Sequence, residues 1–195
     1  MNRTLKYKLI FVVVSALTLA GVVLSIVLLD LGVAGMLAAA IVFLVPGRAG
    51  AYFLRDLFLS RRYVDAGQYE DAIAASERFV RLLDLQPWRQ HFIYCSYCIY
   101  TWNTRAMALN NLGAARMELG LIDDAELPLG EALALDAAYP IPYYNLSVIE
   151  AVREDHARSD QLLSKARQLG FGPSAVDKVI MRVAAAYARV QSVPS

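Results

Sequence analysis

The first 46 residues are almost entirely apolar, and this constrains the chain more than any other feature. Residues 9–29 form a run of 21 without a charge, and residues 31–45 add 15 more after Asp30. The hydrocarbon core of a bilayer is about 30 Å thick and needs roughly 20 apolar residues per helix. The pattern therefore predicts a two-helix transmembrane hairpin over residues 9–46.

Charge is distributed unevenly around this segment. Residues 1–62 carry a net charge of +5, and residues 63–195 carry −4. Basic residues flank both outer ends of the apolar pair, including a basic tail over residues 1–8. By the positive-inside rule, both termini and the following domain should be cytoplasmic, so we expect an integral membrane protein with two transmembrane helices. A cleavable signal peptide is the alternative, but its apolar core is usually only about 7–15 residues long.

The residues after the apolar pair suggest a change of direction. Gly47-Arg48-Ala49-Gly50 is expected to be a hinge, and residues 51–63 mix aromatic side chains with arginines. Such a mixture suits a bilayer interface. The same segment could equally be the first helix of the domain that follows.

Beyond residue 50, apolar and small residues recur with a period near 34. Leu112 and Leu146 are 34 residues apart, as are Ala132 and Ala166. The stretch Gly67–Ala72 (GQYEDA) is similar to the turn between the two helices of a tetratricopeptide repeat. Residues 53–172 thus resemble the tetratricopeptide repeat family. The resemblance implies an all-α solenoid of about three helix–turn–helix repeats over residues 47–172.

The C-terminal segment, residues 173–195, reads as one amphipathic helix that caps this array. Six apolar residues recur at helical spacing: Val176, Val179, Ile180, Val183, Tyr187 and Val190. Ser174 is the expected N-cap. Asp177, Lys178, Arg182 and Arg189 are expected to face away from the array.

Members of the tetratricopeptide repeat family usually bind ligands in the concave groove lined by the first helix of each repeat. The resemblance places the following residues in that groove: Leu57, Arg61, Asn110, Asn111, Ala114, Met117, Glu118, Tyr144, Asn145, Val148 and Ala151. The lysines and arginine of a carboxylate clamp are missing, because Leu57, Ile141 and Asn145 stand in their places. We therefore expect an amphipathic helix or an extended segment as ligand, rather than a charged tail.

An aromatic insertion over residues 87–105 interrupts the repeats, and we expect it to be an extra helix or an extension of the next one. Its aromatic residues are Trp88, Phe92, Tyr94, Tyr97, Tyr100 and Trp102. Because Trp and Tyr bury a large area at low entropic cost, they are candidates for a contact patch with a partner or lipid. The alternative is that they pack against the first repeat and the preceding helix.

His91, Cys95 and Cys98 lie within this insertion at positions i, i+4 and i+7. On an α-helix they would share a face, which makes them weak candidates for metal ligands. A structural zinc site normally needs four protein ligands, and a buried free cysteine is a common core residue. We expect no metal site, with a metal or redox centre as the alternative.

No motif for catalysis occurs, so we expect neither an enzyme nor a cofactor. The net charge of −4 over residues 63–195 argues against a nucleic-acid partner, because phosphates bind to basic surfaces. We expect a membrane-anchored adaptor that binds protein partners at the cytoplasmic face of the membrane, for assembly or quality control of a complex; a homo-oligomer is also possible. The alternative is a structural subunit of a larger integral membrane complex, with the hairpin and the aromatic insertion as interfaces.

Overall fold

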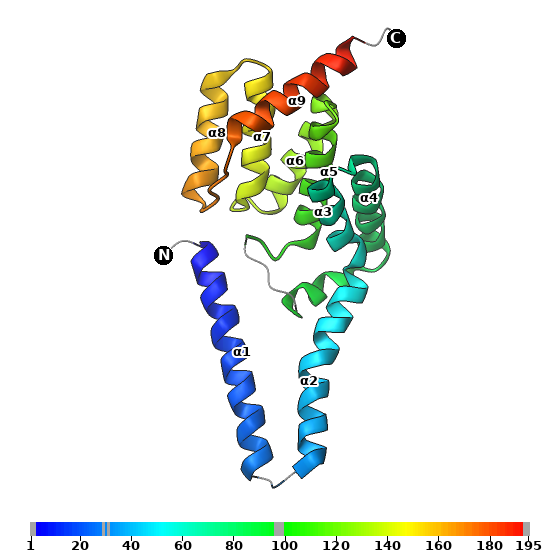
Figure 1. Cartoon of the computed structure of the whole chain (residues 1–195), viewed down its shortest axis with the longest axis vertical. Helices are drawn as coiled ribbons and strands as arrows, with labels where there is room; N and C mark the ends of the chain where they lie inside the picture. The colour runs from blue at the N-terminus through cyan, green and yellow to red at the C-terminus, as the bar shows by residue number, and fades with distance from the viewer. Residues whose placement is uncertain (1–2, 29, 31, 96–99, 193–195) are drawn as a thin grey trace.

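The computed structural model describes residues 3–28, 30, 32–95 and 100–192 of the chain (Figure 1). All regular secondary structure in these residues is helical, which confirms the all-α prediction. Three helical pairs follow one another along the chain and form a repeat-like array. Their helices are α3 (Arg55–Ala66), α4 (Tyr69–Leu85), α5 (Thr104–Glu118), α6 (Ile122–Leu135), α7 (Pro140–Val152) and α8 (His156–Gln168). A last helix, α9 (Val176–Gln191), crosses this array.

The turns between paired helices follow from local residue chemistry. Gly67 ends α3 in the left-handed conformation, with φ 74°, and its amide donates to the carbonyl of Val64. Glycine adopts this conformation without the steric cost that a Cβ imposes. At the N-terminus of α5, the Asn103 side chain accepts a hydrogen bond from the amide of Ala106 at 3.0 Å and so caps the helix.

Each pair of helices buries its apolar stripe against its neighbours. Phe79 of α4 and Leu57 of α3 are fully buried in one cluster, and Leu129 of α6 and Val148 of α7 are buried in another. At Gly113, an added Cβ would lie 2.6 Å from Cγ of Leu129, so α5 and α6 approach closely because this residue has no side chain. The buried apolar residues therefore form separate clusters along the array, each shared by neighbouring helices.

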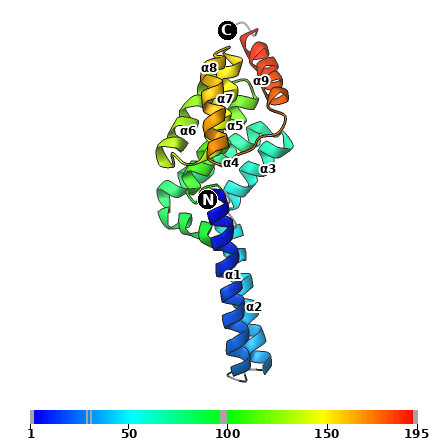
Figure 2. The same cartoon turned by 90° about the vertical axis from the view of Figure 1, so that its left-hand side faces the viewer.

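The two N-terminal helices, α1 (Arg3–Leu28) and α2 (Gly32–Phe53), form a narrow V (Figures 1 and 2). They meet at a turn in which Asp30 and Gly32 both have positive φ. The predicted turn position is correct. The predicted hinge at residues 47–50 is wrong, since α2 runs through it unbroken and ends only at Phe53. One helix therefore connects the V directly to the repeats.

No helix among the described residues is long and apolar enough to cross a membrane. The predicted integral membrane location, with two transmembrane helices and cytoplasmic termini, is therefore wrong. Neither helix is apolar along its whole length: α1 includes Arg3 and Lys6, and α2 carries Pro46-Gly47-Arg48 inside it. The helices that contain the two apolar stretches thus also include charged residues and a Pro-Gly-Arg segment.

The described part of the aromatic insertion contains an extra helix, the first of the two expected alternatives, but it is a 3₁₀ helix and not an α-helix. Pro87–Cys95 forms the 3₁₀ helix η1, and α5 begins separately at Thr104. A 3₁₀ helix has about three residues per turn, so positions four apart do not share a face. The α-helical spacing assumed for His91 and Cys95 therefore does not apply to the backbone of this segment.

Candidate protein-binding face

The first helices of the three pairs, α3, α5 and α7, are connected side by side by buried polar contacts. The amide of Asn111 donates to the hydroxyl of Ser60 at 2.8 Å, which connects α5 to α3. The amide of Asn145 donates to Oδ1 of Asn110 at 3.0 Å, which connects α7 to α5. All four side chains are buried, so these predicted groove residues hold the array together.

Other predicted groove residues lie beneath α9. Met117, Tyr144 and Val148 belong to the same buried cluster as Val183 of α9, which is itself fully buried. Ala114 is buried in the same stretch of α5. The structure thus places the α5 and α7 residues of the predicted groove together, and α9 of the same chain packs against this part (Figure 1).

An ion pair secures α9 to this face. The guanidinium of Arg182 donates to both carboxylate oxygens of Glu118, at 2.6 and 2.5 Å. The side chain of Glu118 is only 9% exposed, and the hydroxyl of Tyr69 also donates to it at 3.4 Å. A bidentate pair of this kind fixes geometry as well as adding energy. The expectation that Arg182 faces away from the array is therefore wrong.

The pKa values of the groups around Glu118 are shifted in the directions that this geometry requires. Burial is the largest cause that raises the pKa of Tyr144 above 10.0, and the negative charge of Glu118 raises it further. The pKa of Tyr69 is raised for the same two reasons in the same order. Its hydrogen bonds to Glu118 raise the pKa of the Arg182 guanidinium. Both tyrosines thus stay neutral, while Arg182 stays charged, at neutral pH.

Gly120 allows α9 to approach so closely. It ends α5 with φ 82°, and a Cβ built on it would lie 2.5 Å from the carbonyl carbon of Ala186 and 2.6 Å from the amide nitrogen of Tyr187. Both are backbone atoms of α9, so they have no rotamer by which to move away. A side chain at position 120 is thus incompatible with the observed position of α9.

The aromatic residues of the insertion divide into two groups. Trp88 and Phe92 pack against Phe53 at the end of α2, with ring centroids 5.0 and 4.4 Å away. Tyr100 instead contacts Phe171, whose ring also meets Tyr144. Trp88 and Phe92 thus pack toward α2, whereas Tyr100 packs toward the segment that follows α8.

The remaining aromatic residues of the insertion are Tyr94, Tyr97 and Trp102. Trp102 packs edge-on against Tyr94, which is exposed, as is Trp88. Tyr97 lies outside the described residues. Among the described aromatic residues of the insertion, Trp88 and Tyr94 therefore keep the largest exposed fractions.

The candidate metal ligands are described only in part. His91 is exposed and stacks on Tyr94 with ring centroids 6.4 Å apart. Cys98 and the side chain of Cys95 lie outside the described residues. Among the residues that are described, no group of three His, Cys, Asp or Glu side chains could hold a metal ion.

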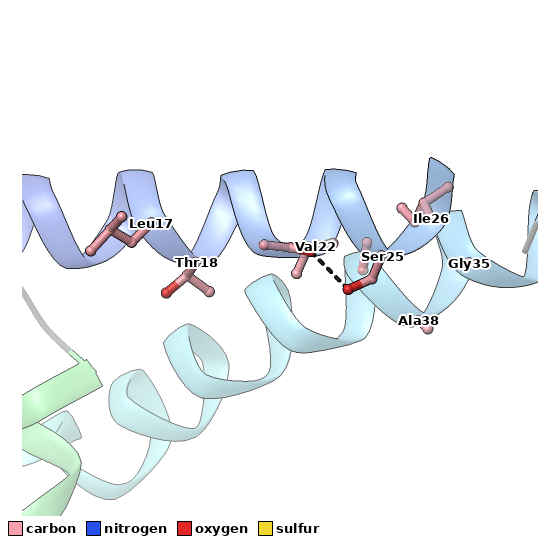
Figure 3. Close-up of a pocket in the computed structure, with 9 residues that line it drawn as sticks. Leu17, Thr18, Val22, Ser25, Ile26, Gly35 and Ala38 are labelled. Carbon is pink, nitrogen blue, oxygen red and sulfur yellow. Dashed lines mark hydrogen bonds between the residues drawn. The ribbon is translucent and has the colours of Figure 1, made fainter. Parts of the chain in front are cut away.

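A separate cavity of about 330 Å³ lies between the arms of the V (Figure 3). It is lined by Leu17, Thr18, Gly21, Val22, Ser25, Ile26, Gly35, Ala38 and Ala39. Its two hydroxyls, of Thr18 and Ser25, donate to backbone carbonyls of α1 at 2.8 Å. The lining is thus apolar, with both hydroxyls engaged by their own helix.

The sequence interpretation missed four residues of the face: Tyr69, Gly120, Arg182 and Phe171. The available signal was the amphipathic pattern of residues 176–190, which shows a buried face but does not say which helices it covers. No protein-family model, characterised sequence or solved structure matches the chain. The face must therefore be interpreted from its own geometry.

Proposed function

We propose that this chain is a protein-interaction scaffold of the tetratricopeptide type, without catalytic activity, and that it binds a helical segment of a partner across α3, α5 and α7. Three consecutive helical pairs with buried contacts between their first helices support this assignment. The observation that carries the proposal is that this face already accepts a helix, α9, through an apolar stripe and one ion pair. A helix in a groove is a recurrent mode of peptide recognition.

A cross-linking experiment tests this proposal. A photoactivatable amino acid is placed at Glu70, which lines the open end of the face, and at Asp160 on the exposed side of α8 as the matched control. We expect a partner to be captured in the source cells at position 70 and not at position 160. The captured protein should then bind the purified chain at a fixed ratio. Equal capture at both positions, or none at position 70, contradicts the proposal.

A second candidate is a structural subunit of a larger assembly, and the surface of the V favours it. Most of the large apolar side chains that are exposed in the described residues lie on α1 and α2, including Val13, Leu24 and Leu37. Contiguous exposed apolar surface of this extent marks a contact region. Helices of another protein packed along the V would bury it.

This candidate predicts a purification result different from the first. The chain should co-purify with other subunits at fixed stoichiometry, and Leu24→Lys should release it from them. Leu127→Lys, at an exposed apolar position in the repeats, is the matched control and should leave the assembly intact. Retention of the Leu24→Lys chain would exclude the V as the interface.

A further inference from the structure

The helix α9 lies where a ligand of this face would lie, rather than at the end of the array. It packs against α7 and α5, and Figure 1 shows it crossing these helices diagonally. Val183 and Ala186 are its two buried residues, and Arg182 reaches Glu118 near the end of α5. It therefore contacts the apolar and the charged part of the face together.

The attachment of α9 is weaker than that of the helices beneath it. α5 buries most of its residues, whereas α9 buries only two of the sixteen in Val176–Gln191. No side chain caps its N-terminus, and Ala175 just before it has φ 56°, which is costly for a residue with a Cβ. These features lower the free energy needed to detach it.

The face continues beyond α9 toward the first repeat. A cavity of about 490 Å³ lies between the C-terminal half of α9 and the turn from α3 to α4. Its lining is Gly67, Tyr69, Glu70, Glu118, Leu119, Ala186, Arg189 and Val190. Two carboxylates therefore face this end, and α9 brings Arg182 to one of them and Arg189 to the rim.

We propose that the face recognises an amphipathic partner helix that carries two basic residues seven positions apart beside an apolar stripe, and that α9 occupies the face until such a helix displaces it. Arg182 and Arg189 have this spacing, and Val183, Ala186 and Val190 form the stripe next to them. Residues seven apart lie on the same side of an α-helix, so both basic groups meet the acidic end. This inference rests on the proposed function.

The test uses the full-length chain and a fluorescent peptide with the sequence of residues 174–192. Binding is measured by fluorescence anisotropy to the wild-type chain and to Arg182→Ala, in which the internal helix is less firmly held. We expect the peptide to bind Arg182→Ala at least tenfold more tightly than wild type. Arg153→Ala is the matched control, since Arg153 makes a comparable pair of contacts to Asp123 and Glu126 away from α9, and it should bind like wild type.

A second set of measurements keeps the Arg182→Ala chain constant and changes only the peptide, so differences in the folding of the chain cannot affect the comparison. A peptide with Arg182→Ala should bind about tenfold more weakly than the parent peptide, because a charge-assisted bidentate contact is lost. A peptide with Arg189→Ala should also bind more weakly, and one with Lys178→Ala should be unchanged. Equal affinity for all four peptides would overturn the proposed basic requirement.

Three outcomes separate the hypotheses. Capture of a partner at position 70, without binding of the α9 peptide to Arg182→Ala, would overturn displacement by α9-like helices and leave the proposed function standing. Failure of both experiments would overturn both proposals. Light scattering that shows the Arg182→Ala chain to be a dimer, with no peptide binding, would mean that α9 exchanges between copies, which also contradicts a partner helix.

Discussion

Replacing Gly120 with alanine should push α9 away from the face without changing any residue of α9. The new Cβ would lie 2.5 Å from the carbonyl carbon of Ala186, whereas ordinary contact begins near 3.4 Å. Protein interiors are packed too closely to absorb such an overlap, so α9 must retreat by roughly 1 Å along its whole contact. Retreat would separate Val183 from its neighbours and lengthen the bonds between Arg182 and Glu118.

The magnitude follows from a comparison with Gly67. Both glycines end a helix with positive φ, 82° at Gly120 and 74° at Gly67, so alanine should cost about 1–2 kcal/mol at either position through backbone strain. At Gly67 the nearest atom to an added Cβ is 4.0 Å away, so no clash follows. Gly120→Ala should additionally lose the burial of Val183, worth about 1.5–3 kcal/mol. We therefore expect a total of roughly 3–5 kcal/mol at Gly120.

Chemical denaturation measures the two losses of free energy of unfolding, and amide hydrogen exchange locates them. In Gly120→Ala, the amides of α9 should exchange faster than in the wild type, while those of α5 and α7 should remain protected. In Gly67→Ala, α9 should keep its protection. Equal destabilisation of the two variants, or protected α9 amides in Gly120→Ala, would refute the reasoning.

Three further predictions test the face and its support. Asn111→Ala leaves the buried hydroxyl of Ser60 without its donor and should lower the free energy of unfolding by about 1–3 kcal/mol, measured by urea denaturation. Gly113→Ala forces Leu129 out of its buried position and should cost about 1–3 kcal/mol in the same assay. Gly130→Ala is the control, because nothing lies within 4 Å of its added Cβ, and alanine inside α6 should raise the free energy of unfolding by about 0.5–1 kcal/mol. Because its folded-state pKa is raised above 10.0, Tyr144 contributes stability that is full below pH 10 and falls as pH rises through the raised value. Tyr144→Phe should therefore show a shallower alkaline loss of stability, and the difference in tyrosinate absorbance between the two proteins should titrate above pH 10.

The helical pairs could be predicted because their signals are local. A period near 34 and glycine at turn positions such as Gly67 and Gly120 identify each helix–turn–helix, and stripes of apolar residues identify its buried side. The glycines and the stripes depend on residues a few positions apart, and the period repeats this local pattern, so the sequence displays all three directly. The pairing of Asn110 with Asn145 could not be read in this way, since it joins residues 35 positions apart on two different helices.

The N-terminal helices and the insertion were harder to predict for a different reason. Apolar content predicted a spanning hairpin, and the glycines at positions 47 and 50 predicted a hinge, but α2 continues through these glycines to Phe53. In the insertion, Pro87–Cys95 is a 3₁₀ segment whose Phe92 packs against Phe53, although no glycine or internal proline marks the change from an α-helix. A contact between residues so far apart in sequence is not visible in a local pattern.

The position of α9 shows what an amphipathic pattern leaves undetermined. The stripe from Val176 to Val190 requires a buried side, and stacking on α8 as a terminal cap or lying across α5 and α7 would both supply one. Arg182 distinguishes them, because only the second arrangement brings its guanidinium to the almost buried carboxylate of Glu118. Removing Arg182 would leave the almost buried carboxylate of Glu118 without this partner, so the pair adds a preference for one position of the helix that the apolar stripe alone does not supply. A partner helix that supplies its own arginine would satisfy Glu118 equally well, and on this ground α9 can be replaced by a ligand of the same pattern.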